Sequence, residues 1–475
     1  MNFESIEFKR LFALNFYKSL RLKLGEMSLE KDFVNGKNGD PYPLFFKSEN
    51  CTEELVHNAY KVREGTAKRF LCHFFPYASY ELAADTVQGS AGFCFILPDT
   101  EEVSITVTAD ELIFQCGERT ERHTLPKWKQ ADAAMTVSCR PGAFDVYFTN
   151  RNSLAYFLSF SVPSFADSHR YDIFRDGKVA VQLTDGATLY RSSAFIDSGI
   201  SIADPRTLRY ENGEPMYENG KIYLTASIRL QSGSMQGVFS WVPGTAEFEL
   251  VGVIYYDSGD GKWCRDVAAS ILYHREKKRW YLWVCSFAHD HILGHAEFEG
   301  DPRFGINVID IELMEKAKEG EHFTDFVGFS GDEDPDFFWD AEIQKWRMAI
   351  CRVNPETKRY RYVFFESDQP FSDYRYVGQG LEGAETGGSF VKLDNDLYFL
   401  CGNDFSAVSD YRIYSKSGMI KAKFDLRDGG CRGWGTLIPV RMGSRTRLYW
   451  ITFDRHRGSD YPWSYGNLYC FEAMI

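Results

Sequence analysis

The sequence lacks a long apolar run, a paired-cysteine motif and an excess of basic residues. No run of roughly 18 apolar residues occurs anywhere in the chain of 475 residues, so we expect no membrane-spanning helix. The eleven cysteines are scattered and include no C-x-x-C pair, which favours reduced thiols over a disulfide framework. The 54 Lys and Arg against 67 Asp and Glu give a net charge of -13, which argues against a nucleic-acid partner.

The first 24 residues carry charges throughout and lack the apolar core of about 7–15 residues that marks a signal peptide. We therefore expect a cytoplasmic protein with no membrane partner. Hydrophobic residues make up 44% and charged residues 25% of the chain, proportions typical of a globular protein with a large core. Nothing in the sequence indicates the oligomeric state.

Amphipathic helices are scarce, and short ones are expected only within residues 1–24 and 311–320. Aromatic residues, in contrast, make up 16% of the chain. They favour strands, and their flat faces also suit stacking against sugar rings. Closely spaced β-type runs between Glu102 and Val162 predict a β-sandwich over about residues 61–165, with the preceding 60 residues packed onto it.

A repeat of roughly 50 residues follows from about residue 175. Each of five segments has an acidic or polar opening, an apolar strand, a tight polar turn and a second apolar strand, a pattern that predicts a hairpin. The openings are Glu214, Asp266, Asp334, Glu385 and Trp434, at spacings of 52, 68, 51 and 49 residues. With two further strand-like runs between hairpins, the repeat predicts five four-stranded blades.

The predicted fold class is therefore all-β. An N-terminal β-sandwich with an extension occupies residues 1–170, and a five-bladed β-propeller that carries the active site occupies residues 175–475.

The inner strands of a propeller begin around one mouth of its central channel, so the five openings should converge there. Four of them are the carboxylates Glu214, Asp266, Asp334 and Glu385. Clustered carboxylates raise one another's pKa, which costs stability but suits general acid and base catalysis. A single such acid is more often a solvated turn residue, so the shared register of the four is what points to chemistry.

Two of these segments resemble a known superfamily. DEDPDFFWD…KWRMAICR from Asp332 resembles the Asp-Pro opening and following hairpin of the five-bladed propeller glycoside hydrolases of families 43 and 32. ETGGSFVKLDNDLYFLCG from Glu385 resembles their general-acid segment, and CRDVAASILYHREKKRWYLW from Cys264 would hold the first Asp. The resemblance covers about residues 195–475, and the sandwich is expected to be concanavalin- or LamG-like.

The resemblance implies three catalytic residues: Asp266, Asp334 and Glu385. In these families one Asp is nucleophile or general base, a second orients and tunes, and the Glu protonates the leaving oxygen. The register of the first blade stays open, because Asp204-Pro205 stands ten residues before Glu214-Pro215.

Further residues are predicted to bind substrate through hydroxyl contacts or ring stacking. They are Glu214, Arg265, Arg352, Trp434, His289 and His456. His289 belongs to the run AHDHILGH, in which no fourth metal ligand is evident, so no metal ligand is assigned. No cofactor is expected, although a structural calcium or other metal in the propeller channel stays open.

The resulting hypothesis is a glycoside hydrolase that removes a terminal sugar, such as a furanose, from an oligosaccharide. One alternative is a glycoside phosphorylase that holds phosphate with Arg265, Arg352 or the cluster Arg455–Arg457. Another is a non-catalytic carbohydrate-binding protein. The acidic openings favour the hydrolase, since they would repel a phosphate dianion.

Overall fold

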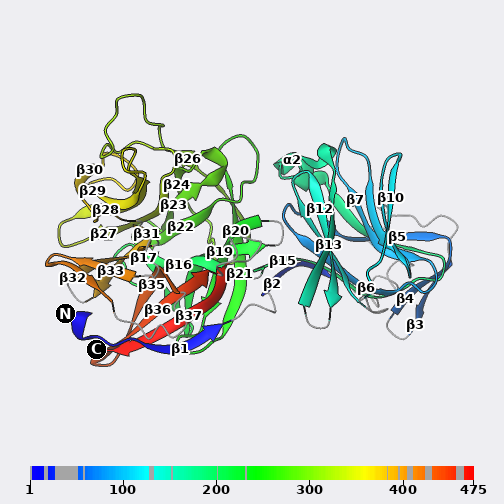
Figure 1. Ribbon diagram of the computed structural model, residues 1–475, viewed down its shortest axis with the longest axis horizontal. Coiled ribbons are helices and arrows are strands. Elements are labelled where there is room, and N and C mark those ends of the chain that lie inside the picture. Colours follow the sequence, from blue (N-terminus) through cyan, green and yellow to red (C-terminus); the bar gives the residue numbers. More distant parts are fainter. Residues whose placement is uncertain are drawn as a thin grey trace.

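The computed structural model is almost entirely β-structure, arranged as two groups of sheets (Figure 1). It describes residues 3–14, 20–26, 52–56, 59–127, 133–150, 153–199, 202–230, 233–381, 383, 385–393, 396–403, 410–422, 431–455 and 465–475. Within these ranges the one α-helix is α2 (Tyr171–Asp176). Three short 3-10 helices accompany it: η1 (Phe3–Ser5), η2 (Pro163–Phe165) and η3 (Phe287–His289).

The first group is a sandwich of two antiparallel sheets. One sheet has the order β10-β9-β8-β7-β14-β5 and contains β10 (Arg119–Thr124), β9 (Glu111–Cys116), β8 (Val103–Val107), β7 (Ser90–Ile96), β14 (Lys178–Thr184) and β5 (Thr66–His73). The other has the order β13-β12-β11-β6-β15-β4-β3 and contains β13 (Ser153–Ser161), β12 (Ala143–Asn150), β11 (Met135–Arg140), β6 (Ser79–Asp85), β15 (Thr188–Asp197), β4 (Ala59–Glu64) and β3 (Thr52–Val56), with β2 (Arg21–Glu26) paired to β15. Inward side chains of both sheets, such as Phe95 and Phe144 with ring centroids 4.6 Å apart, form the core.

The second group consists of five sheets, one for each predicted blade. Blade 1 contains β16 (Ile202–Thr207), β19 (Lys221–Leu230), β20 (Gly233–Trp241), β21 (Phe248–Asp257) and β25 (Gly305–Asp310), with β18 (Tyr217–Glu218) paired to β19. Blade 2 contains β17 (Arg209–Tyr210), β22 (Val267–His274), β23 (Arg279–Ser286), β24 (Ile292–Phe298) and β26 (Glu312–Leu313). Blade 3 contains β27 (Glu333–Asp340), β28 (Lys345–Val353), β29 (Tyr360–Ser367) and β30 (Arg375–Gln379). Blade 4 contains β31 (Glu385–Leu393), β32 (Asp396–Asn403), β33 (Asp410–Ser415) and β34 (Gly418–Lys421), and blade 5 contains β35 (Cys431–Met442), β36 (Arg445–Arg455), β37 (Tyr465–Met474) and β1 (Lys9–Leu14).

The five blades close into a ring. Contacts join β16 to β22, β22 to β27, β27 to β31, β31 to β35, and β35 back to β16. Because the inner strands form a closed cycle, the second group is a five-bladed propeller, and the predicted all-β fold of sandwich and propeller is confirmed.

The N-terminal segment departs from the prediction. Residues 9–14 do not pack onto the sandwich as a helix but form β1, which pairs antiparallel with β37 and is the edge strand of blade 5. The apolar side chains of β1 thereby continue a sheet that is already half-buried. Residues 311–320 likewise contain the short strand β26 and turns in place of the expected helix.

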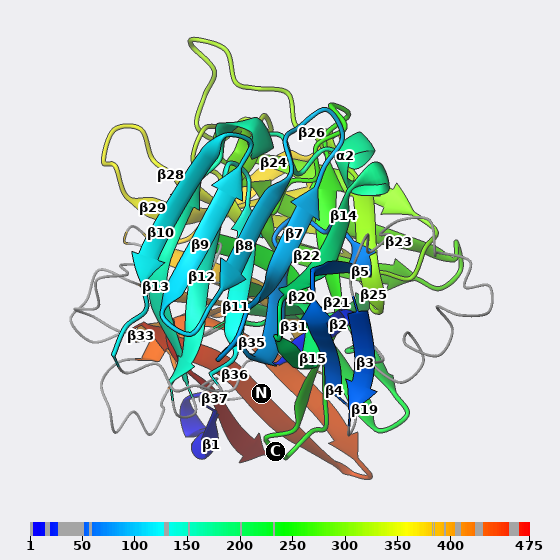
Figure 2. The same cartoon turned by 90° about the vertical axis from the view of Figure 1, so that its right-hand side faces the viewer.

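The domain boundary also lies later than predicted. β14 and β15 pair with β7 and β6, so the sandwich extends to Asp197 and the propeller begins at Ile202. The sheet that contains β12 and β13 is the one that faces the propeller, whereas the β10-β9-β8-β7-β14-β5 sheet lies on the outer side (Figure 2). Tyr255 of blade 1 donates a hydrogen bond to the carbonyl of Pro76 at 2.7 Å, and Trp263 packs on Phe174.

Nine cysteines whose side chains the structure describes are free. No helix within those ranges is long and apolar enough to cross a membrane.

Candidate active site

The innermost strand of every blade contains a β-bulge at an equivalent position. The pairing with the second strand shifts between Ala203 and Arg206, between Val267 and Ser270, between Glu333 and Asp336, between Thr386 and Ser389, and between Cys431 and Gly435. The first unpaired residue has a left-handed backbone in four blades: Asp204 (φ 51), Ala268 (φ 60), Asp334 (φ 47) and Gly387 (φ 63). A bulge of this kind re-aims a side chain, and a non-glycine residue in this conformation is a place to look for function.

Contacts across the ring place these four residues at the channel. The backbone N–H of Gly387 in blade 4 donates to Asp334 Oδ2 at 2.9 Å, and Arg206 Nη1 of blade 1 donates to the Gly387 carbonyl at 3.0 Å. Blades 1 and 3 thus present carboxylates at this level, while blades 2 and 4 present only Ala268 and Gly387.

Asp204 and Asp334 are both nearly enclosed, with 7% of each residue exposed. Burial raises the pKa of Asp334 to about 7, and the negative charges of Asp204 and Glu333 act in the same direction. The charge of Arg206 and the hydrogen bond from Gly387 oppose this rise. Asp334 therefore holds a proton for part of the time at neutral pH, beside a second carboxyl.

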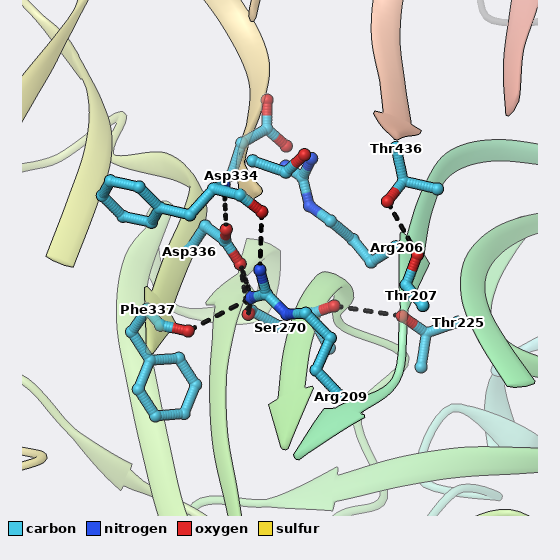
Figure 3. A network of polar contacts seen from close by, with 12 residues as sticks. Arg206, Thr207, Arg209, Thr225, Ser270, Asp334, Asp336, Phe337 and Thr436 are labelled. Carbon is cyan, nitrogen blue, oxygen red and sulfur yellow. Dashed lines mark hydrogen bonds and ion pairs between the residues drawn. The ribbon is translucent and has the colours of Figure 1, made fainter. Parts of the chain in front are cut away.

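One level deeper, a buried ion pair closes the channel (Figure 3). Asp336 Oδ1 accepts hydrogen bonds from Arg209 Nη2 at 2.5 Å and from Ser270 at 2.6 Å, and its Oδ2 accepts one from the Phe390 N–H at 2.6 Å. These bonds join blades 2, 3 and 4, since Arg209 and Ser270 both belong to blade 2, so Asp336 and Arg209 have a structural role.

Asp266 and Glu385 stand two residues before the left-handed position, and this offset turns their side chains into their own blades. Asp266 accepts hydrogen bonds from Ser286 Oγ at 2.8 Å and from the Ala288 N–H at 3.2 Å. Burial raises the pKa of Asp266.

Glu385 Oε1 accepts hydrogen bonds from Arg412 Nη1 at 2.9 Å and from the Tyr414 hydroxyl, both on the third strand of blade 4. Its Oε2 accepts the N–H of Tyr362 at 3.3 Å. Glu385 has no exposed surface. Of the three predicted catalytic residues, Asp334 contacts Gly387 across the ring, whereas the contacts of Asp266 and Glu385 are with side chains and N–H groups of blades 2, 3 and 4.

Arg352, a predicted substrate-binding residue, is fully buried, and every donor of its guanidinium has a partner within the protein. Nε and Nη2 donate to Asp332 at 2.8 and 2.9 Å. The remaining donors bond the carbonyls of Phe323, Asp325 and Val327. Asp332 occupies the same register as Asp266 and Glu385, so all three carboxylates are buried anchors within blades.

The assignment of Glu214 to the mouth is also wrong. Its side chain is 62% exposed and lies 3.7 Å from Arg275, in the turn that follows β22. Asp266 precedes the other end of β22, eight residues or about 26 Å away at about 3.3 Å per residue. Asp204 takes the place in blade 1 that the sequence repeat gave to Glu214, because the inner strand there is β16.

Arg265 and His289 lie near the start of blade 2. The Arg265 guanidinium lies 5.1 Å from the centre of the Tyr77 ring, which the sandwich contributes. His289 contacts Ser286 Oγ at 2.8 Å through Nδ1 and Ser258 Oγ at 3.2 Å through Nε2, so both ring nitrogens have partners. The side chains of Trp434 and Arg455 lie outside what the structure describes, as do His456 and Arg457.

The residues predicted from the sequence to form the site do not include Arg206, nor the pair of His291 and Glu333 next to Asp334. His291 Nδ1 lies 3.0 Å from Glu333 Oε1, which also accepts a hydrogen bond from the Tyr360 hydroxyl at 3.4 Å. The bond to Glu333 raises the pKa of His291. The sequence signal that could have located the first-blade acid is the shared Asp-Pro pair at residues 204–205 and 334–335. No group of three or more His, Cys, Asp or Glu side chains suited to a metal ion occurs within the described ranges.

No family model matches the chain, and no curated protein matches it. Solved structures with a similar fold include a thermostable family-43 glycoside hydrolase, at 14% identity and a TM-score of 0.37, covering 57% of this chain and 89% of that one. An α-L-arabinofuranosidase from Podospora anserina is 12% identical, with a TM-score of 0.37, and the match covers 58% of this chain and 91% of that one. A carbohydrate-binding module from Bacillus subtilis is 12% identical, with a TM-score of 0.24, and the match covers 30% of this chain and 90% of that one. These likenesses are too distant to indicate an activity, and the fold of this chain is established by its own strand pairing.

Proposed function

We propose that the chain is a glycoside hydrolase in which Asp334 protonates the leaving oxygen and Asp204 is the nucleophile or the general base. The observation that carries this proposal is the pair of enclosed carboxyls at equivalent bulges of blades 1 and 3, one of which has a pKa of about 7. Glycoside hydrolysis needs one protonated and one ionised carboxyl on opposite sides of the scissile bond.

The environment of the pair supports this division of labour. The negative charge of Asp204 raises the pKa of Asp334, so the two groups do not both ionise readily. Arg206 Nη1 is bonded to Gly387, whose own N–H is bonded to Asp334, which fixes the orientation of the proton donor. The Asp334 proton is transferred to the glycosidic oxygen as the bond to the anomeric carbon breaks. Asp204 either deprotonates a water that attacks this carbon, or attacks it directly to give a glycosyl-enzyme, which a water deprotonated by Asp334 then hydrolyses.

The acid segment that resembles the propeller glycosidases begins at Glu385, and the resemblance would make that residue the proton donor. Arg412, Tyr414 and the N–H of Tyr362 already donate hydrogen bonds to its two oxygens. We therefore assign Glu385 a structural role, as with Asp332 in blade 3.

A phosphorylase is less well supported. It must hold a dianion beside the sugar, but Arg352 is consumed by Asp332 and three carbonyls, and Arg265 lies against Tyr77. The decisive experiment is a screen of aryl glycosides and of oligosaccharides with furanose and pyranose ends, run with and without inorganic phosphate. A hydrolase releases free reducing sugar at a rate that phosphate does not change. Release of a sugar 1-phosphate would overturn the proposal, and binding without turnover would identify a carbohydrate-binding protein.

A further inference from the structure

The guanidinium of Arg206 is buried, and two of its three nitrogens make no hydrogen bond to the described residues. Arg206 is 2% exposed, and its Nη1 donates to the Gly387 carbonyl at 3.0 Å. Among the described residues, neither Nε nor Nη2 has a hydrogen-bond partner. Buried donors on a charged group are rarely left unpaired, because they have lost water without replacement.

The two unused donors lie on one edge of the guanidinium. Nε–H and one Nη2–H point in parallel, which is the arrangement that binds two oxygens of one ligand at once. Two other buried arginines of the propeller have a carboxylate partner: Arg209 bonds Asp336, and Arg412 bonds Glu385. Arg206 has none within hydrogen-bond distance in the described part of the chain.

The location of this edge points to the ligand site. Arg206 follows Asp204 by two residues, and its side chain extends toward Asp334 (Figure 3). Asp336 and Arg209 close the channel below. A ligand held between the two carboxyls would therefore rest on the guanidinium of Arg206.

The surrounding charges select the ligand class. The acidic groups near Arg206 are Asp336, Asp334 and Asp204, and Arg209 neutralises only the first. An anionic ligand would meet two further carboxyls, whereas two neighbouring hydroxyls of a neutral sugar accept the same two hydrogen bonds without adding charge.

We infer that Arg206 is the residue at the floor of the channel that recognises a vicinal diol of a neutral sugar ring, through Nε and Nη2. This inference rests on the proposed carbohydrate ligand but does not require hydrolysis. It assigns a specificity-determining contact: an acidic sugar is disfavoured, and a sugar that lacks either of the two hydroxyls binds weakly.

Calorimetric titration of the full chain tests this with uncleavable monosaccharides. The probes are D-galactose, D-xylose and L-arabinose, each beside its monodeoxy analogues, with D-galacturonate and inorganic phosphate as anions. One of the neutral sugars should bind, and the loss of either hydroxyl of one vicinal pair should weaken it about 10- to 100-fold, the range for hydrogen bonds to a charged donor. This arm uses the unmodified protein and does not depend on a variant that folds.

The variant arm compares Arg206→Lys with Arg275→Lys. Arg206→Lys retains the charge but loses the paired donors. Its affinity for the intact sugar should therefore be about 10- to 100-fold lower. Its affinity for the deoxy analogue should equal that of the unmodified protein. Arg275→Lys, at the far end of the channel, should change neither value. Failure of all three neutral sugars to bind, tighter binding of galacturonate or phosphate, or undiminished binding to Arg206→Lys would each overturn the inference. Sugar binding without turnover on any substrate would overturn the proposed hydrolase and leave the role of Arg206 standing.

Discussion

Asp204 and Asp334 occupy the same position in blades 1 and 3: each is the first residue of a bulge, each has a left-handed backbone, and each precedes a proline. A residue before proline favours the extended region, so two such aspartates carry a conformational cost. The strand pairing on both sides holds them in place. The result is a pair of carboxyls directed into the channel from blades that are not neighbours, which is the arrangement that acid and base catalysis on a bound sugar requires.

Replacement of Asp334 by asparagine should remove the proton donor with little change of shape. Activity on a substrate with a poor leaving group should fall by roughly 10²–10⁴, since proton transfer contributes about that factor. An aryl glycoside with an acidic leaving group needs less protonation and should lose far less. The ratio of kcat/KM for the two substrates measures this difference.

Asp204→Asn provides the comparison in the same assay. A nucleophile or base is needed for every leaving group, so kcat/KM should fall by a similar factor for both substrates. Asp310→Asn, exposed on the outer strand β25, should have no effect. Equal losses on both substrates in Asp334→Asn would contradict its role as proton donor.

The charge of Glu333 raises the pKa of Asp334, so its removal should be visible in the pH profile. Activity that needs protonated Asp334 falls as the pH rises through about 7. In Glu333→Gln the pKa of Asp334 is lower, and the falling limb of kcat/KM should move toward lower pH. Glu342→Gln, in the turn of the same blade, should leave the limb in place. A limb that stays fixed or moves upward in Glu333→Gln would show that another group controls it.

The blade architecture could be predicted from the sequence, but the direction in which each carboxylate side chain points could not. Hairpin turns and alternating strands repeat every 49 to 68 residues and predict the blades. Whether a carboxylate faces the channel depends on its offset from the bulge, and an offset of two residues separates Asp334 from Asp332. The bulge itself arises from pairing with the second strand and leaves no local motif.

Two other features depend on residues far apart in the chain. The pairing of β1 with β37 joins segments more than 450 residues apart, which no local pattern reveals. In blade 1 the sequence around Glu214 and the turn before Lys221 resembles the opening of the other repeats. The inner strand of this blade is nevertheless β16, which lies earlier in the chain. The Asp-Pro pair is the more informative signal, since residues 204 and 334 share the same left-handed backbone at the bulge.

The raised pKa of Asp334 also predicts how stability depends on pH. Its folded pKa of about 7 lies above the ordinary value of 3.8, so the folded state binds the proton more tightly. This contribution to the free energy of unfolding is complete below about pH 4 and is lost as the pH rises through about 7. In Asp334→Asn the free energy of unfolding should fall less between pH 4 and 8 than in the unmodified protein. Urea titrations across this range measure both curves, and parallel curves would count against a raised pKa.

Arg352→Met should destabilise the propeller without a specific effect on substrate binding. The substitution leaves the fully buried Asp332 without its cation, and breaking a buried ion pair in this way costs about 3–5 kcal/mol. The measurement is the urea midpoint together with KM for the folded fraction. Arg375→Met, exposed on β30, should stay within about 0.5 kcal/mol of the unmodified protein. A variant of normal stability with a raised KM would restore Arg352 as a substrate-binding residue.

Glu385→Gln separates the two roles that this residue could have. If Glu385 is the proton donor, its loss should lower the activity on the substrate with a poor leaving group far more than the activity on the aryl substrate, as expected here for Asp334→Asn. A buried anchor lost at the same position leaves Arg412 and the Tyr414 hydroxyl without the carboxylate that accepts their hydrogen bonds, and an amide would place an N–H donor against one of these donors or against the N–H of Tyr362. We therefore expect a lower Tm and a similar fractional loss of activity on both substrates. If Glu385→Gln keeps its Tm and recovers on the activated substrate while Asp334→Asn does not, the proton comes from blade 4, and Asp334 acts by tuning the pKa of Glu385.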